Sequence, residues 1–303
     1  MKKVLALVLV LSMVFALAAC GSNSQENVKD SNVLNIATKP ITEQYILGEM
    51  LKAVIEANTE YKCEITKGIA GGTSNIMPGM QSGEFDLYPE YTSSGYVIVL
   101  GHNASGVEDA AMWEQLRKEY QENYKMDWIG QYGFNNTYCV TVRGDVAREY
   151  GLVTTSDLAK VADKLVFGGN PDYLERADGF NKVCETYGLK FKDVKSIDIG
   201  VKYAAMENGD VDVINGYTTD AQLGAQDVLA LEDDLKLQVN YFCSTVVRQD
   251  VLDACAGLEE ALMLMDGILS DKEMAGLNAQ VEVEGKDEAE VARAYLVEKG
   301  IIK

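Results

Sequence analysis

The sequence predicts an α/β protein built from two similar lobes. From residue 33 onward, short strand-like segments alternate with segments of helical periodicity, which is typical of an α/β fold. The segment MQSGEFDLYPEYT at 80–92 recurs without a gap as MENGDVDVINGYT at 206–218. The roughly 270 residues after residue 32 are also more than one hydrophobic core usually serves, so the length favours two lobes.

Each copy of this repeat has the pattern of a helix end, a glycine turn, a short apolar strand and a Tyr-Thr pair where the strand ends. The copies lie too far apart for a solenoid, so the repeat indicates two lobes of like architecture. Similar strand and turn patterns occur in unrelated α/β proteins, but identities in register favour shared geometry. The identical pairs are Met80/Met206, Gly83/Gly209, Asp86/Asp212, Tyr91/Tyr217 and Thr92/Thr218. We therefore expect the two tyrosines at equivalent strand ends, where open α/β sheets bind ligands.

The first elements can be placed one by one. A strand is predicted at 33–39 and ends at Pro40, and Thr42 is placed to cap a helix at 42–57. One face of that helix carries the apolar side chains Ile46, Leu47, Met50, Leu51, Val54 and Ile55. The glycine-rich segment GIAGGTSN at 68–75 lacks the lysine of a P-loop. It could hold an anionic group on its amides or serve only as a tight turn.

The remaining elements follow from the same patterns. Further strands are predicted at 61–66, in the first repeat copy, and at 137–142, 165–169, 196–199, 211–214 and 241–248. Helices are predicted up to Ser82, at 107–124, 156–160, 180–187 and 202–208, and repeatedly after residue 250. No Gly/Ser-rich linker divides the middle of the chain, so we expect strands to join the lobes.

The N-terminus has the pattern of a secretory signal. Lys2 and Lys3 precede an apolar run at 4–17 that is too short to remain in a bilayer as a span. The sequence Leu-Ala-Ala-Cys that follows resembles a bacterial lipobox, which implies that residues 1–20 are a lipoprotein signal peptide and that Cys20 is lipidated. Residues 21–32 are polar and lack periodicity, so they are predicted to be a flexible tether. The expected location is the extracytoplasmic face of the cell membrane, with the lipid as the only anchor.

Composition excludes several classes of function. Asp and Glu number 47 against 27 Lys and Arg, which argues against binding nucleic acid or an anionic membrane surface. The only histidine, His102, lies in a predicted loop, and no Cys/His cluster is present, so we expect no metal, no cofactor and no enzymatic activity. Besides Cys20 the cysteines are odd in number and cannot all pair with one another; they are Cys63, Cys139, Cys184, Cys243 and Cys255.

Tyrosine is the over-represented aromatic residue, with 16 copies against 7 Phe and 2 Trp. Several of these tyrosines fall on helices, where packing explains them. Four fall at strand ends or beginnings: Tyr91, Tyr138, Tyr217 and Tyr241. If the two lobes face each other, these rings could form a box around a quaternary ammonium group, with each ring–cation contact giving about 0.5–2 kcal/mol.

Five ordered motifs carry a resemblance to a known family. They are ATKPITEQYI from residue 37, DLYPEYT from 86, YGFNNTY from 132, RADG from 176 and GYTTD from 216. The chain from residue 33 to 303 resembles the osmoprotectant-binding proteins, which are substrate-binding lipoproteins of ABC importers for glycine betaine, carnitine and choline. The resemblance implies a type II periplasmic-binding-protein fold of two α/β lobes and a two-strand hinge. It places residues 33–137 and 241–303 in lobe 1 and 138–240 in lobe 2.

The same resemblance assigns the site. It implies that Tyr91, Tyr138, Tyr217 and Tyr241 form the trimethylammonium cage and that Lys39, Ser94 and Arg176 hold a substrate carboxylate. The alternative for the two basic residues is a solvated strand end and a solvated helix start. Because choline has no carboxylate, two retained cations favour a zwitterion such as glycine betaine. Ergothioneine carries both groups as well and stays possible.

The expected mechanism is binding by closure of the lobes, followed by docking of a monomer on an ABC permease that an ATPase drives. Two alternatives belong to other classes. In the first, the protein is a two-lobed receptor for another small solute, such as an amino acid, and the tyrosines only support the structure. The second alternative, a surface enzyme, needs a base or a metal that the sequence does not supply.

Overall fold

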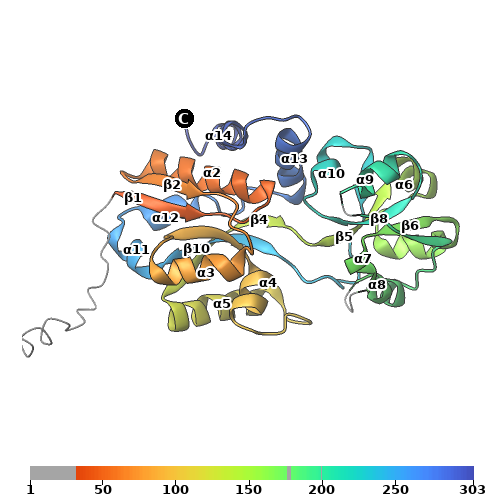
Figure 1. The fold of residues 1–303 in the computed structure, drawn as a ribbon, viewed down its shortest axis with the longest axis horizontal. Coiled ribbons are helices and arrows are strands. Elements are labelled where there is room, and N and C mark those ends of the chain that lie inside the picture. The colour runs from red at the N-terminus through yellow and green to blue at the C-terminus, as the bar shows by residue number, and fades with distance from the viewer. Residues whose placement is uncertain (1–31, 176–178, 199) are drawn as a thin grey trace, which may run out of the picture. The chain divides into compact units, whose positions relative to one another are not determined.

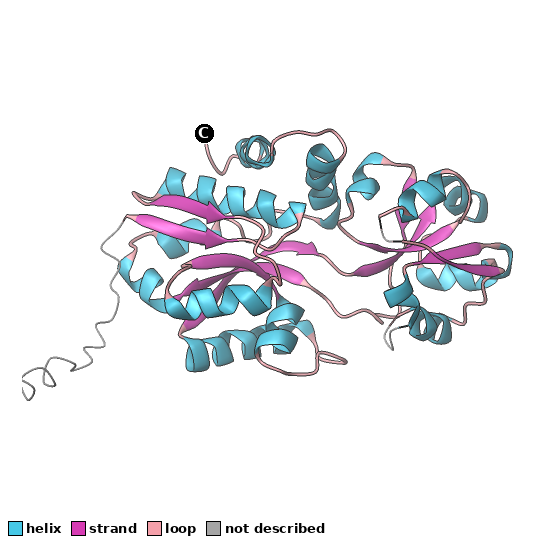
Figure 2. Cartoon of the chain, in the orientation of Figure 1, coloured by secondary structure: helices cyan, strands magenta, loops and turns pink. Residues whose placement is uncertain are grey.

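The computed structural model describes residues 32–175, 179–198 and 200–303, which lie in one compact unit (Figure 1; Figure 2). The predicted signal peptide, Cys20 and nearly all of the predicted tether lie outside these residues, as does Arg176. The described chain forms two five-stranded sheets, each with its own helices, so the predicted α/β fold of two lobes is confirmed.

The first sheet has the strand order β2-β1-β3-β10-β4. Its strands are β1 (Val33–Ala37), β2 (Lys62–Thr66), β3 (Leu87–Tyr91), β4 (Met126–Asn135) and β10 (Phe242–Arg248). Strand β1 is parallel to β2 and β3, whereas β10 is antiparallel to β3 and β4. A strand from late in the chain therefore completes a sheet that the N-terminal half begins.

Helices cover both faces of this sheet, and the side chains of the strands alternate between two cores. Leu87 packs into the core beneath α2 and the C-terminal helices, while its neighbour Tyr88 packs into the core with α3 and α5. The helices are α2 (Thr42–Asn58), α3 (Thr73–Ser82), α4 (Thr92–Ser94), α5 (Asp109–Tyr124), α11 (Gln249–Ala254), α12 (Leu258–Met263), α13 (Asp271–Glu282) and α14 (Glu288–Glu298). A π-helical segment, η1 (Gly95–Val99), follows α4.

The second sheet has the order β7-β6-β8-β5-β9. Its strands are β5 (Tyr138–Arg143), β6 (Val166–Gly169), β7 (Asp193–Ser196), β8 (Val213–Tyr217) and β9 (Val228–Ala230). Its helices are α6 (Gly144–Tyr150), α7 (Pro171–Glu175), α8 (Phe180–Tyr187), α9 (Lys202–Glu207) and α10 (Ala221–Ala225), with 3₁₀ segments η2 (Thr155–Lys160) and η3 (Ala162–Lys164). In Figure 1 these elements are green to turquoise and form the second lobe.

The sheets share one topology, and the repeat occupies equivalent places in both. Strands β3 and β8 are each the third strand, between a parallel neighbour on one side and an antiparallel neighbour on the other. In both copies the glycine that ends the preceding helix has a positive φ, 82° at Gly83 and 77° at Gly209, which favours glycine over other residues. The repeat therefore reports duplicated geometry, as its sequence predicts.

The repeated aspartate explains part of this conservation of shape between the lobes. Asp86 accepts a hydrogen bond from the amide of Asn35 at 2.6 Å, in the middle of β1. Asp212 accepts one from the amide of Val166 at 2.9 Å, at the start of β6. Each carboxylate thus ties the repeated strand to its parallel neighbour.

Two chain segments cross between the sheets, one from β4 to β5 and the other from β9 to β10. They are hydrogen-bonded to each other: the amide of Asn136 donates to the Tyr241 carbonyl at 3.2 Å and the Thr137 hydroxyl to the Val239 carbonyl at 2.7 Å. Helices α10 and α13 also pack closely, since a Cβ added at Gly224 would lie 2.9 Å from the Ala275 carbonyl oxygen. These are the contacts of a two-strand hinge, and the packing of α10 against α13 lies beside it.

A few predicted elements differ from the observed ones. The strand predicted at 196–199 is wrong in position, because β7 pairs with β6 over Asp193–Ser196 and β6 ends at Gly169. The segment predicted as a helix at 156–160 is a 3₁₀ turn, held by a capping box between Thr154 and Asp157. The long strand β4 was absent from the sequence prediction.

Candidate functional site

The four tyrosines predicted as a cage lie together. Tyr91 ends β3, Tyr217 ends β8, Tyr138 begins β5, and Tyr241 directly precedes β10. Among the described residues, they line a cavity of about 270 Å³ together with Asn136 of the hinge. The sheet topology produces this convergence, because each lobe directs the carboxyl end of its third strand to the crossing segments. Asn136 escaped the sequence prediction, although it lies within the YGFNNTY motif.

Two of these rings form a tilted pair in the second lobe. Tyr138 and Tyr217 are direct partners in the antiparallel ladder, so their side chains leave the sheet side by side. Their ring centroids lie 4.7 Å apart at an interplanar angle of 32°. The Tyr217 hydroxyl donates to the Tyr138 hydroxyl at 3.1 Å. The ring of Tyr173 lies on Tyr138 as well, with the two centroids 5.4 Å apart.

The third ring, Tyr91, is buried and bound to a buried acid. Its hydroxyl donates to the carboxylate of Glu43 on α2 at 2.5 Å. The same carboxylate accepts from Asn136 Nδ2 at 3.0 Å and from Asn278 Nδ2 at 3.4 Å. Burial raises the pKa of Glu43, while donors from Tyr91, Thr219, Asn136 and Asn278 oppose that rise. Burial also keeps the Tyr91 hydroxyl protonated, with its pKa well above the usual value.

Lys39 lies beside the ring of Tyr91 and is paired with Glu90. Its ammonium group forms a buried ion pair with Glu90 and lies 4.7 Å from the centroid of the Tyr91 ring. Glu90 also accepts from the Tyr91 amide at 2.7 Å and from the Thr73 hydroxyl at 2.7 Å. The carboxylate therefore fixes both the backbone and the cation beside this tyrosine. Lys39 is near the pocket but is not one of the residues that line it.

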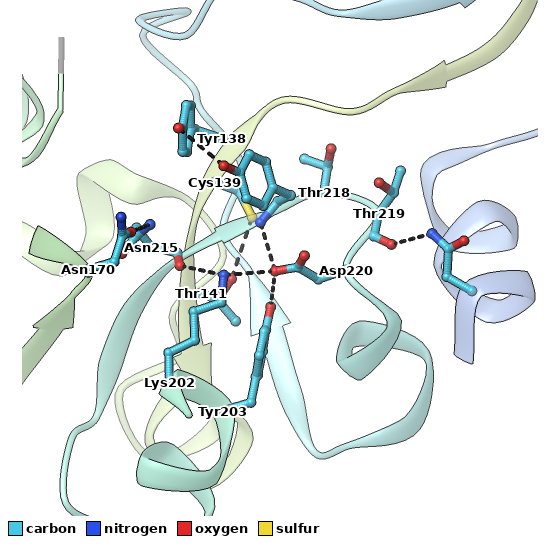
Figure 3. Close-up of polar contacts among 12 residues, drawn as sticks. Tyr138, Cys139, Thr141, Asn170, Lys202, Tyr203, Asn215, Thr218, Thr219 and Asp220 are labelled. Atoms are coloured by element: carbon cyan, nitrogen blue, oxygen red, sulfur yellow. Dashed lines mark hydrogen bonds and ion pairs between the residues drawn. The ribbon is translucent and has the colours of Figure 1, made fainter. Parts of the chain in front are cut away.

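A comparable arrangement supports Tyr217 in the second lobe (Figure 3). Lys202, the first residue of α9, is buried and lies 5.3 Å from the centroid of the Tyr217 ring. Its ammonium group donates to the Asn215 carbonyl at 3.0 Å and to Asp220 at 3.2 Å. Asp220 accepts in addition from the Tyr203 hydroxyl at 2.6 Å and from the Tyr217 amide at 3.0 Å. Each repeated tyrosine thus has its amide on a carboxylate and a lysine ammonium group near its ring.

The other two residues predicted to bind the ligand are Ser94 and Arg176. Ser94 is half-buried in α4, three positions after Tyr91, and does not line the small cavity. Arg176 lies outside the described residues. The sequence prediction missed the supporting groups Glu43, Glu90, Lys202 and Asp220. Glu43, Glu90 and Asp220 lie within three of the quoted motifs, ATKPITEQYI, DLYPEYT and GYTTD, whereas Lys202 lies in none of them.

A larger cavity of about 1120 Å³ is lined in part by hinge residues, among them Asn135, Thr137 and Val239. Its lining includes residues 104–109, 228–233 and 236–240, and Tyr138 is the one aromatic residue among the described residues that line it. Because it lacks converging rings, it does not offer the chemistry of a cation box. The 270 Å³ pocket is therefore the better candidate site.

Other chemistry has little support in the described part of the chain. Within those residues, no group of three or more His, Cys, Asp and Glu side chains is placed to hold a metal ion. His102 lies in a loop, as predicted, with its Nε2 atom 2.9 Å from Glu119. None of the helices described has the length and apolar character needed to cross a bilayer.

Two lobes of one topology, joined by paired crossing segments around an aromatic pocket, define a substrate-binding protein. Comparison with known families identifies it further, because residues 32–298 match the family described as the substrate binding domain of ABC-type glycine betaine transport systems. The chain belongs to this family. It is the substrate-binding component of an ABC importer of the osmoprotectant class, and the resemblance stated from the sequence motifs is confirmed.

Individual relatives agree with this family. The ergothioneine transport permease and binding protein EgtU of Helicobacter pylori is 34% identical over 275 residues, covering 91% of this chain and 49% of that protein. The chain therefore spans about half the length of that relative. The carnitine transport binding protein OpuCC of Listeria monocytogenes is 31% identical, covering 97% of this chain and 96% of that protein. The crystal structure titled as a glycine betaine/carnitine/choline ABC transporter matches with a TM-score of 0.83 at 27% identity, over 89% of this chain and all of that one.

Proposed function

We propose that this protein binds a quaternary ammonium zwitterion, such as glycine betaine, carnitine or ergothioneine, for import. The trimethylammonium group enters the pocket of Tyr91, Tyr138, Tyr217 and Tyr241. The observation that carries the proposal is the convergence of these four rings, from both lobes and the hinge, on one cavity of about 270 Å³. A cation that cannot donate hydrogen bonds gains most from such ring faces, about 0.5–2 kcal/mol for each.

The carboxylate of the ligand binds to Lys39, Ser94 and Arg176 in this proposal. Lys39 is near Tyr91, and Ser94 follows Tyr91 by one turn of α4, so both lie close to the first lobe's share of the pocket. The ammonium group of Lys39 has three N–H donors, and its pair with Glu90 leaves donors for a second carboxylate. Choline, which lacks a carboxylate, would leave these cations without a ligand partner and is the weaker candidate.

Binding is coupled to closure of the lobes in the proposed mechanism. Because Tyr91 and Tyr217 come from different sheets, a ligand that contacts both favours the conformation in which they are close. The closed complex then docks as a monomer on the permease, while the lipid on Cys20 holds the protein at the extracytoplasmic face of the membrane. Solute is released unchanged, since the protein acts as a receptor without catalytic chemistry.

Isothermal titration calorimetry of the purified protein tests this proposal. Glycine betaine, carnitine, proline betaine, choline and ergothioneine are titrated in turn, and the protein is extracted afterwards to recover the ligand unaltered. We expect at least one zwitterion to bind more tightly than choline. Absence of heat with all five compounds would refute the ligand class. Chemical conversion of a bound compound over time would favour the enzyme alternative.

Replacing Tyr217 by Ala separates the proposal from a receptor whose tyrosines are only structural. Loss of one ring–cation contact should weaken the preferred ligand by about 2- to 30-fold. Replacing Tyr124 by Ala is the matched control, since this half-buried ring lies on α5 and outside the pocket. Equal affinity in all three proteins would favour a receptor for another solute.

A further inference from the structure

The charges around Tyr91 do not cancel among the described residues. Lys39 is paired with Glu90, so those two groups neutralise each other. Glu43 accepts from neutral donors, namely the hydroxyls of Tyr91 and Thr219 and the amides of Asn136 and Asn278. Since Glu43 is buried, its carboxylate is the uncompensated charge next to the pocket.

The hydrogen bonds of Glu43 suit an ionised carboxylate. Its Oε1 atom accepts two hydrogen bonds and its Oε2 atom a third, from donors on β3, the hinge and α13. Burial raises the pKa of Glu43, whereas the donors on both oxygens oppose this rise and favour the ionised form, which accepts at both oxygens. A buried anion held only by neutral dipoles costs free energy, and a cation in the adjacent pocket would offset that cost.

We propose that Glu43 is the counter-charge of the aromatic pocket, selecting a cationic headgroup over a neutral group of the same shape. This inference rests on the proposed function of the pocket. Glu43 acts through two of the five lining residues, because Tyr91 donates its proton toward the carboxylate and Asn136 is held by it. A phenol that donates to an anion has a more electron-rich ring, which strengthens its attraction for a cation.

A purely structural role predicts a different outcome. Asn278, which donates to Glu43, also donates to the carbonyl of Thr219 in the second lobe at 2.9 Å. Glu43 could therefore merely hold the first lobe, the hinge and the second lobe together. In that case its replacement would weaken every ligand by the same factor, whatever the ligand's charge.

The test compares Glu43→Gln with the wild-type protein on two probes of one shape. The first probe is glycine betaine, and the second is 3,3-dimethylbutanoate, in which carbon replaces the charged nitrogen. Coulomb's law at an effective dielectric constant near 20 gives about a fiftyfold effect for charges roughly 7 Å apart. After screening, we expect Glu43→Gln to weaken glycine betaine by about tenfold or more, and 3,3-dimethylbutanoate to bind equally or better.

Two further variants keep the outcome decisive. Glu49→Gln removes a carboxylate from the same helix, where Glu49 pairs with Lys67 at 2.7 Å, and should leave both affinities unchanged. Glu43→Asp keeps the charge, so it should retain more preference for glycine betaine than Glu43→Gln does, including when both variants are less stable. An equal loss for both probes, or no loss for glycine betaine, overturns the role of Glu43. Failure of the wild-type protein to bind any quaternary ammonium compound refutes the proposed function instead.

Discussion

Removing Asp220 is expected to be the most destabilising single change at the buried ion pair beneath Tyr217. The variant Asp220→Asn leaves the Lys202 ammonium group, whose side chain is 5% exposed, without a counter-charge. It also weakens the acceptor for the Tyr203 hydroxyl and the Tyr217 amide. Breaking one side of a buried pair typically costs about 3–5 kcal/mol in the free energy of unfolding.

The reverse change should cost less. In Lys202→Met, Asp220 keeps the two neutral donors and is 20% exposed, so water can solvate part of its charge. We expect a loss of about 1–3 kcal/mol. The double variant removes both charges, and its loss should fall short of the sum of the two single losses by at least about 1 kcal/mol.

Urea denaturation of the ligand-free protein at neutral pH, followed by circular dichroism, measures this coupling energy. The matched control is the pair of Arg148 and Asp227, which has a 2.7 Å contact in the same lobe but side chains that are each 66% exposed. The control cycle using Arg148→Met and Asp227→Asn should be additive, because water screens this exposed pair. If the Lys202 and Asp220 cycle is additive to within about 0.5 kcal/mol, the ion pair does not have the buried character described above.

Three other predictions concern packing, pH and ligand binding. Gly224→Ala places a Cβ 2.9 Å from the Ala275 carbonyl oxygen of α13, so it should lower the free energy of unfolding by about 1–3 kcal/mol in urea denaturation. Gly276→Ala is the control and should not lower it, because the space at its Cβ is open. The Lys299 ammonium group and the Ser270 hydroxyl lower the pKa of Glu273 from 4.5 to about 2. The ionised, half-exposed carboxylate therefore stabilises the fold above pH 4.5 by less than about 1 kcal/mol. The difference in melting temperature between the wild-type protein and Glu273→Gln should disappear as the pH falls toward 2. Tyr217→Phe keeps the ring and should retain more affinity for a quaternary ammonium ligand in calorimetry than Tyr217→Ala; equal losses would contradict a ring–cation contact.

The sequence predicted the parts of the fold that have local signals. The helix at Thr42–Asn58 follows from its apolar face, and the equivalence of β3 and β8 follows from the repeated Gly, Asp and Tyr. Strand β4 was missed because Gly130 and Gly133 adopt φ values of 63° and 106° within it, which breaks the alternation that identifies strands. The second glycine is required there, since a Cβ at Gly133 would lie 2.5 Å from the Leu269 carbonyl oxygen.

The residues of the site that lie at strand ends could be predicted from the sequence, whereas those brought in by packing between distant elements could not. The repeat and the motifs indicated Tyr91, Tyr138 and Tyr217, and the strand predicted at 241–248 indicated Tyr241. Glu43, by contrast, follows Thr42 in the first turn of a helix, where an acid is ordinarily explained by the helix dipole and by solvent. Its role depends on Asn136 and Asn278, and no local pattern brings three positions so far apart in the chain together.

The duplicated lobes reach the same environment for their tyrosines by different routes. In the first lobe the carboxylate on the tyrosine amide is Glu90, the residue directly before Tyr91. The equivalent position in the second repeat copy is Gly216, where a Cβ would lie 3.1 Å from the Tyr203 hydroxyl and 3.4 Å from Asp220. Asp220 supplies the carboxylate from beyond the strand instead, and the glycine leaves room for it. The carboxylate comes from different sequence positions in the two lobes, yet it accepts from the tyrosine amide in both. An alignment of the two repeat copies cannot reveal this shared contact, because it exists only in the folded site.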